Sequence, residues 1–263
     1  MFSKVGTYKA AGLFSLSHII SIMVCFVLIA LAVWHTKKMN KQTYFKMLKI
    51  FAIIVTILEV VKIFLAWGEK KFTLNAWLPL FFCSLYIYSL WLTCFNNKIL
   101  KDLGLSYIAF ASIVAGIAFI VFPTTSFTWY PIFHFRCLHS MIYHSMMVYT
   151  GIMLYVTKAF EVDLKAVLKY CVFTLTFMLL ALIININYDS NLMFISNPGM
   201  VPLPFLHAIY NSSPVMFTIL MLFAHIALMG FGVFGIVKLV EYFKNRKNEF
   251  ENDELEELEH KIS

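Results

Sequence analysis

The chain has 263 residues, of which 61% are apolar and only 13% are charged. Soluble domains carry about one-quarter charged residues, so this composition excludes an ordinary water-soluble domain. The net charge of +7 is typical of nucleic-acid-binding proteins, but the basic residues lie mainly in alternate connections between apolar runs, which argues against a nucleic-acid partner.

Seven runs of about 18 or more apolar residues follow one another along the chain. Each is long enough to cross a hydrocarbon layer of about 30 Å as a helix that satisfies its own backbone. The sequence therefore predicts an all-α fold, a polytopic membrane bundle of seven transmembrane helices within residues 1–240. The runs are Leu16–Trp34, Met47–Trp67, Trp77–Phe95, Ser106–Phe122, Ile132–Val156, Leu168–Ile186 and Met216–Val237.

The distribution of Lys and Arg predicts the orientation of this bundle. Fifteen of the 21 basic residues lie in or beside the connections that follow the first, third, fifth and seventh runs, and in the C-terminal tail. Cytoplasmic connections carry such an excess, so we expect the N-terminus outside and the C-terminus inside. A bacterial plasma membrane is the expected location.

The first run has an alternative interpretation as a signal peptide. Lys4 and Lys9 precede it, and it ends in the small-residue sequence Ala30-Leu31-Ala32. The run is longer than the usual 7–15 residues of such a segment, and several lysines follow it. Retention as the first helix is therefore favoured over cleavage.

Polar and ionisable side chains inside the runs are candidate site residues, because burying them in hydrocarbon is costly. With a rise of about 1.5 Å per helical residue, most of them fall in the outer half of the bundle. Five helices contribute at that depth, as a binding pocket requires. The candidates are His18, Glu59, Lys62, Cys83, Ser84, His134, Arg136, His139 and His144, with Asn191 in the loop after the sixth run.

Several of these residues also have purely structural interpretations. Glu59 and Lys62 are three positions apart on one helical face and can neutralise each other. Taken alone, His18 is better explained as a hydrogen-bonded core histidine, and Cys83 as a small apolar residue. The common depth of the group is what favours a site.

The sequence predicts neither a metal nor a cofactor. His134, His139 and His144 are spaced by five residues, which places successive rings about 140° apart on a helix. That spacing does not make a two-histidine metal face. The five cysteines are odd in number and follow no disulfide or zinc pattern. There is also no glycine-rich phosphate loop.

Two further segments stand apart from the spans. Asn187–Ser213 contains several asparagines and three prolines, yet is too apolar for a disordered loop, so we expect a lid over the outer mouth of the bundle. Residues 241–263 form a charged cytoplasmic tail with eight acidic and four basic residues. Its apolar residues Phe250, Leu255, Leu258 and Ile262 recur at near-helical spacing, which also fits a docking helix.

Several stretches of the chain resemble the bacterial YwaF-like integral membrane family. They are Phe14-Ser-Leu-Ser-His18, Glu59, Trp77-Leu-Pro-Leu-Phe-Phe-Cys83-Ser84, His134 through His144, and Asn191-Leu-Met-Phe-Ile. That family is similar to a eukaryotic family of multi-pass acyltransferases that remodel ether phospholipids, and more distantly to the androgen-induced lipid hydrolases. The resemblance implies a nucleophile at Cys83 and a base at His139.

The expected function is therefore lipid acyl transfer or hydrolysis through an acyl-cysteine. His139 would deprotonate Cys83, Arg136 or Lys62 would hold the lipid phosphate, and His18 or Glu59 would orient the base. The partners would be membrane lipids, with a phospholipid or lysolipid as substrate. A transporter or small-ligand-binding membrane subunit is the main alternative, and a structural protein without a ligand is a third.

Overall fold

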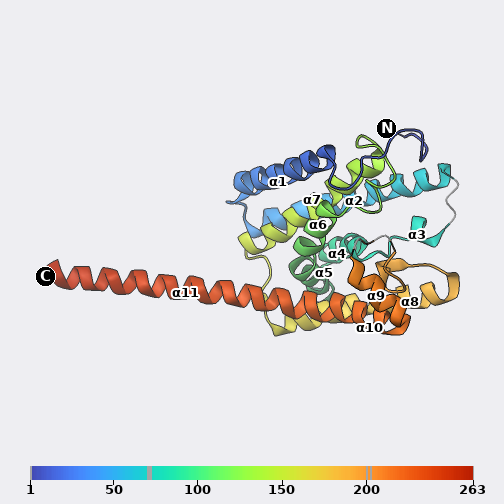
Figure 1. Ribbon diagram of the computed structural model, residues 1–263. Helices are drawn as coiled ribbons and strands as arrows, with labels where there is room; N and C mark the ends of the chain where they lie inside the picture. The colour runs from blue at the N-terminus through green and yellow to red at the C-terminus, as the bar shows by residue number, and fades with distance from the viewer. Residues whose placement is uncertain (1, 70–72, 200, 202, 263) are drawn as a thin grey trace.

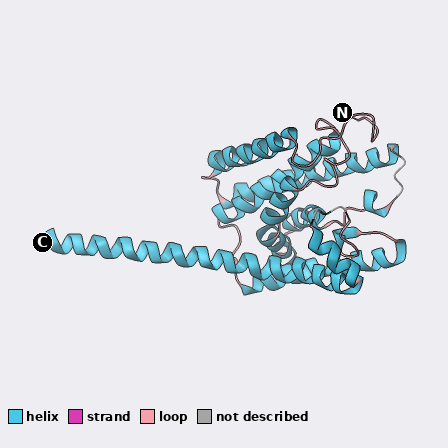
Figure 2. Ribbon diagram, in the orientation of Figure 1, coloured by secondary structure: helices cyan, strands magenta, loops and turns pink. Residues whose placement is uncertain are grey.

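The computed structural model describes residues 2–69, 73–199, 201 and 203–262, with side chains as far as residue 248. This part of the chain is built from helices and connecting loops and contains no strand (Figure 2). The predicted all-α fold is confirmed.

Three long helices cross the bundle without a break, and each begins at a side-chain cap. Ser15 accepts a hydrogen bond from a first-turn amide of the first helix, Asn40 does so for the second, and Asp163 for the third. Caps of this kind satisfy amides that have no partner within the helix. The helices are α1 (Leu16–Thr36), α2 (Lys41–Gly68) and α8 (Leu164–Tyr188).

The third apolar run is broken, so the prediction of one continuous helix over Trp77–Phe95 is wrong. It contains α3 (Leu74–Trp77), an extended segment, the 3₁₀ turn η1 (Phe82–Ser84) and α4 (Leu85–Thr93). Pro79 explains the break, because proline lacks an amide donor and forces the preceding residue into an extended conformation. Leu78 has the expected angles, with φ −82° and ψ 116°.

The fourth run also departs from a straight helix. It forms α5 (Lys98–Phe110) and α6 (Ser112–Val121), which meet at an angle of 43°. The pair begins eight residues before the predicted Ser106, because Asn97 caps α5 by accepting from two backbone amides at 2.9 and 3.2 Å.

The last run changes its helical pitch within the bundle. α10 (Pro214–Phe223) passes into the π-helical turn η3 (Ala224–Leu228) and then into α11 (Met229–Ile262). Figure 1 shows α11 extending far beyond the other helices. The predicted tail is therefore one helix with the last span, while the apolar side chains that suggested a docking face, from Phe250 onward, lie beyond residue 248, where side chains are not described.

The helix of the fifth run is α7 (Phe135–Val156), with 22 residues and several polar side chains in its first half. It starts three residues after the predicted Ile132, because His134 caps it with a ring nitrogen 3.1 Å from the Arg136 amide. Among the described helices, five spans are long and apolar enough to cross a membrane, and the bent α5–α6 pair makes a sixth. A seventh crossing by α7 stays a prediction.

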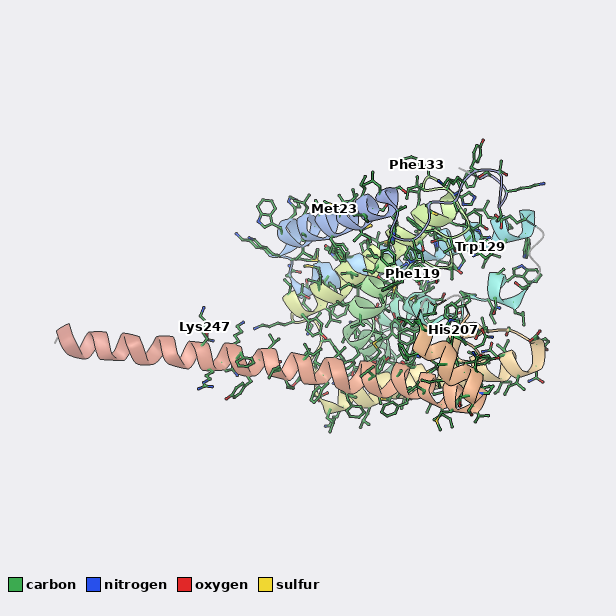
Figure 3. The ribbon with its side chains drawn as sticks, viewed as in Figure 1. Met23, Phe119, Trp129, Phe133, His207 and Lys247 are labelled. Carbon is green, nitrogen blue, oxygen red and sulfur yellow. The ribbon has the colours of Figure 1, made fainter. Side chains whose placement is uncertain are left out.

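The helices form two sides with α4 and α5 between them. In Figure 1, α1, α2 and α7 lie on one side of the bundle, and α8, α10 and α11 lie on the other. Large apolar side chains such as Met23 and Phe133 project from the outside, where their exposed fractions are 62% and 76% (Figure 3). Such an apolar exterior fits a lipid environment.

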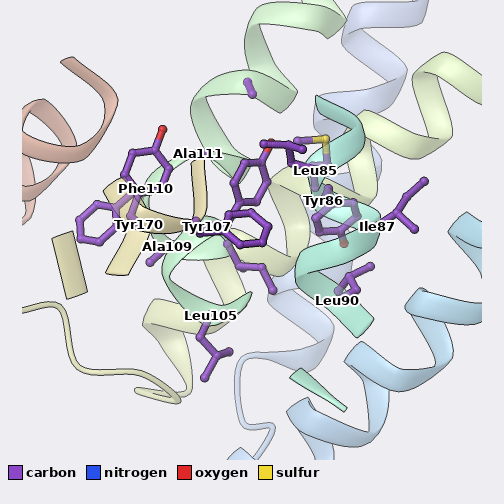
Figure 4. Packing of buried hydrophobic residues seen from close by; sticks show 14 of the residues in the cluster. Leu85, Tyr86, Ile87, Leu90, Leu105, Tyr107, Ala109, Phe110, Ala111 and Tyr170 are labelled. Carbon is purple, nitrogen blue, oxygen red and sulfur yellow. The ribbon is translucent and has the colours of Figure 1, made fainter. Parts of the chain in front are cut away.

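Buried tyrosines complete the hydrogen bonding of the irregular segments. In hydrocarbon an unpaired backbone carbonyl costs several kcal/mol, so each break in a span needs a donor. The core contains these rings among Leu85, Leu90 and Phe110 (Figure 4). The hydroxyl-to-carbonyl bonds run from Tyr107 to Phe82 (2.5 Å), from Tyr143 to Cys83 (3.0 Å) and from Tyr170 to His225 (2.5 Å).

The segment expected to act as a lid folds onto the bundle. It contains the 3₁₀ turn η2 (Leu192–Phe194) and α9 (Pro204–Ser212). Met193 and Phe194 have φ values of 59° and 54°, a left-handed conformation that is strained for residues with side chains. Two asparagines, Asn185 and Asn191, bind the surrounding backbone and hold the turn in place.

Candidate functional site

A cavity of about 610 Å³ lies between the two sides of the bundle. Helices α2 and α7 line it from one side, η3 and the start of α11 from the other, and η1 lies along it. Met193, Phe194, Val201 and Leu203 of the covering segment complete the wall. The segment expected to act as a lid therefore forms part of the cavity wall.

Cys83 lines this cavity at the break in the third span. It lies in η1, which leads directly into α4, so it occupies the N-terminal end of a half-helix. The cap residue Phe81 offers no side-chain hydrogen bond to the first amides of the turn. These amides carry the positive end of the helix dipole, which favours a negative charge nearby. Ser84 lines the same wall.

Glu59, Lys62 and His139 form a polar group on the cavity wall. Lys62 and Glu59 make an ion pair along α2, as their spacing allowed. The second Glu59 carboxylate oxygen lies 3.7 Å from His139 Nε2, which is outside hydrogen-bond range. That ring nitrogen is buried and has no hydrogen-bond partner within the described part of the chain.

His144 presents a second buried histidine nitrogen one turn further along α7. Its Nδ1 lies 2.7 Å from the Ser140 carbonyl oxygen, which can only accept, so the proton is on Nδ1. Nε2 is then a hydrogen-bond acceptor, and no described residue donates to it. The ring stacks on Phe119 at 4.0 Å between centroids, and both residues line the cavity.

Arg136 lines the cavity but is held by an acidic partner. Its guanidinium lies 3.2 Å from a Glu69 carboxylate oxygen and over the ring of Tyr130. Glu69 also accepts from the Tyr130 hydroxyl at 2.9 and 3.1 Å. Each cation of the cavity thus has a carboxylate beside it, because Lys62 is paired in the same way.

Three predicted site residues lie outside the cavity lining. Both ring nitrogens of His18 are engaged by backbone, with the Phe14 amide at 2.9 Å and the Ile120 carbonyl at 3.2 Å. His134 caps α7 and bonds the Ser3 carbonyl at 3.0 Å. Asn191 bonds within the covering segment. These residues hold elements together, and none of them adjoins Cys83.

Sequence reasoning missed several polar residues of the cavity, among them Tyr143 and His225. Tyr143 lies between His139 and His144 in sequence and donates to the Cys83 carbonyl. His225 reaches the cavity from η3. A histidine inside the seventh apolar run was visible in the sequence and met the same criterion as the other candidates. Its place in a π-helical turn was not visible.

The described residues contain no group of three or more His, Cys, Asp or Glu side chains arranged to hold a metal ion.

Comparison with known proteins gives one match. The model of the TMEM164 family covers residues 13–233, which is most of the chain and includes every helix that lines the cavity. The chain belongs to the TMEM164 family. No curated protein and no solved structure shows a significant match.

Membership in the TMEM164 family agrees with the architecture. TMEM164 is a family of membrane proteins, and the structure supplies several apolar helices of membrane-spanning length. The protein is therefore a multi-pass membrane protein.

Proposed function

We propose that this TMEM164-family protein is a lipid acyltransferase or hydrolase that works through an acyl-cysteine at Cys83. The observation that carries the proposal is the position of Cys83, at the start of a half-helix inside a broken span and on the wall of the cavity. A cysteine attacks as its thiolate, and a helix N-terminus stabilises that anion. Interrupted spans are also where membrane proteins bind ligands.

His139 is the proposed base. A Glu59 carboxylate oxygen lies 3.7 Å from its Nε2, so a small closing movement would let Nε2 donate to the carboxylate and leave Nδ1 to accept a proton. In hydrolases with a catalytic triad, a carboxylate orients the catalytic histidine in the same way, with one ring nitrogen as donor and the other as base. Glu59 is then a positioning residue, while His144 adds an acceptor nitrogen on the same helix.

The first step converts a phospholipid ester into a thioester. His139 takes the Cys83 proton, and the thiolate attacks the ester carbonyl carbon. As the carbon–oxygen bond breaks, the leaving lysolipid oxygen receives the proton from His139. The acyl group remains on the sulfur until a lysolipid hydroxyl or water takes it and the sulfur regains a proton.

The basic residues of the cavity supply the proposed contact with the lipid phosphate. Arg136 offers a planar, bidentate donor and Lys62 a point charge. Both already pair with carboxylates, so the phosphate would compete with Glu69 or Glu59. The cavity volume of about 610 Å³ lies within the range of about 300–1,000 Å³ that is usual for small-molecule sites.

The proposal also covers the membrane topology of the chain and its relationship to other protein families. Seven crossings, with α7 as the fifth, place the N-terminus outside and the C-terminus in the cytoplasm of a bacterial cell. The likeness to YwaF-like proteins and to the ether-phospholipid acyltransferases supports the acyl chemistry. The substrates are membrane phospholipids and lysolipids.

A transporter or small-ligand-binding subunit is the second candidate, and the Glu59–Lys62 ion pair favours it. Ionisable groups on a cavity wall inside a membrane also serve ion coupling. In that case Glu59→Gln would abolish function while Cys83→Ala would not. An acyl-cysteine enzyme gives the reverse order, with Cys83→Ala the more severe change.

The decisive test is intact mass spectrometry of the purified protein after incubation in phospholipid nanodiscs. We expect a mass increase of one acyl group that hydroxylamine removes and that Cys83→Ser abolishes. Cys171→Ser is the matched control, because Cys171 is a half-buried cysteine that does not line the cavity. An unmodified wild-type protein in every lipid mixture would refute the acyl-cysteine mechanism.

A further inference from the structure

His225 is fixed in place on every side except one. Its Nδ1 lies 2.7 Å from the Met221 carbonyl oxygen, which accepts the Nδ1 proton. Its own carbonyl accepts from the Tyr170 hydroxyl at 2.5 Å. Its ring meets the ring of Phe82 edge to face, at 4.5 Å between centroids. Only Nε2 remains, and no described residue donates to it.

The π-helical turn places this side chain on the cavity. The extra residue in the turn Ala224–Leu228 shifts the helical register, and such turns occur frequently at functional sites. His225 and Met229 line the cavity from this side. The rest of that wall, formed by the covering segment and Phe81, is apolar. Facing the cavity without a partner from the described residues, this acceptor nitrogen is available to a hydroxyl donor of a bound molecule.

The ring contacts the residue that precedes the proposed nucleophile, and it comes from a different side of the bundle than the first base. Phe82, which His225 contacts, immediately precedes Cys83. His139 and its acidic and basic neighbours come from α2 and α7, on the other side of the bundle (Figure 1). The cavity therefore has one wall with charged groups and another with a neutral acceptor.

We propose that His225 binds the hydroxyl group of the acyl acceptor and takes its proton in the second step. This inference rests on the acyl-cysteine function proposed above. The hydroxyl oxygen attacks the thioester carbonyl as its proton moves to His225 Nε2, and the carbon–sulfur bond breaks. The thiolate of Cys83 then recovers a proton from His225, so the enzyme returns to its starting state.

The acyl acceptor is a hydroxyl compound, and it is either a lysolipid or water. A lysolipid hydroxyl gives acyl transfer, and water gives hydrolysis. His139 serves the first step, in which the leaving oxygen needs a proton. His225 serves only the second, so its loss leaves formation of the thioester intact.

The test follows the Cys83 thioester over time by intact mass in phospholipid nanodiscs, with and without added lysolipid. For His225→Phe, which keeps the ring shape but has no acceptor, we expect formation at the wild-type rate and decay at least about 100 times slower. His225→Gln cannot take a proton either and is expected to behave in the same way. His207→Phe is the control, because His207 lies in α9 and does not line the cavity.

The outcomes separate the two proposals. Wild-type decay of the thioester in both His225 variants overturns the role of His225 and leaves the acyl-cysteine function standing. Failure of folded His225 variants to form a thioester that wild type does form also overturns the assignment to the second step. A wild-type protein without any thioester refutes the function itself. Decay that requires lysolipid identifies a transferase, and decay in its absence identifies hydrolysis.

Discussion

His18 illustrates how a polar residue inside a span serves the fold. Its ring is fully buried and connects the Phe14 amide, before α1, to the Ile120 carbonyl in α6. An apolar replacement would leave both backbone groups unpaired in a region that water does not reach. Losing a buried partner costs about 1–3 kcal/mol for each group.

We therefore expect His18→Leu to lower stability by about 2–6 kcal/mol, since two backbone groups lose their partner. Thermal unfolding of the purified protein in one detergent measures the change as a lower Tm. His35→Leu in the last turn of the same helix is the control, because His35 is exposed. Equal Tm values for the two variants would contradict the role assigned to His18.

For individual residues, the sequence predicted much of the cavity lining but few of the hydrogen-bond partners. Glu59, Lys62, Cys83, His139 and others were selected for their depth in the spans, and the structure brings them to one cavity. His18 was selected by the same criterion, but it does not line the cavity. Depth along a helix follows from residue number, whereas facing depends on how helices rotate and pack, which a single sequence does not contain.

Individual helices are positioned by close approach as well as by hydrogen bonds. Gly104 of α5 lies against α4, where a Cβ atom would stand 2.3 Å from the Ser89 carbonyl oxygen. Real contacts are never that short, so a side chain here must push the two helices apart. Small residues at such crossings are what allow membrane helices to pack closely.

Gly104→Ala is expected to destabilise the protein by about 1–3 kcal/mol, because overpacking displaces the backbone of α4. The Tm of the purified protein measures the loss. Gly235→Ala is the matched control, since a Cβ atom at Gly235 meets nothing within 4 Å. A Tm for Gly104→Ala at or above that of Gly235→Ala would contradict this packing.

Hydropathy predicted the positions of the helices but not their breaks, their bend or the π-helical turn. The runs that became α1, α2 and α8 end within a few residues of their predicted bounds, apart from the earlier start of α2 at Lys41. Pro79 was a visible signal for the broken span. The bend after Phe110 and the π-helical turn had no such signal, because they depend on donors such as Tyr170 that lie far away in sequence.

The proposed topology makes a prediction for the molecule as a whole. Tyr8 is exposed in the N-terminal segment, and Asn245 is exposed on α11 where it extends beyond the bundle. With an odd number of crossings, these two positions lie on opposite sides of the membrane. The orientation from Lys and Arg places Tyr8 outside.

In intact bacterial cells, a membrane-impermeant maleimide should label Tyr8→Cys and should label Asn245→Cys only after permeabilisation. The protein with its five native cysteines alone sets the background. Labelling of both variants from outside would mean an even number of crossings. Labelling of Asn245→Cys alone would reverse the orientation.

The continuity of α11 connects the cavity to the far end of the molecule. The helix starts at Met229 on the cavity wall and continues for 34 residues. At about 1.5 Å per residue it is roughly 50 Å long. If it turns as a rigid rod, a tilt of one degree at the cavity moves its tip by about 1 Å. The length of the helix thus converts a small change of its angle at the cavity into a larger displacement of its far end.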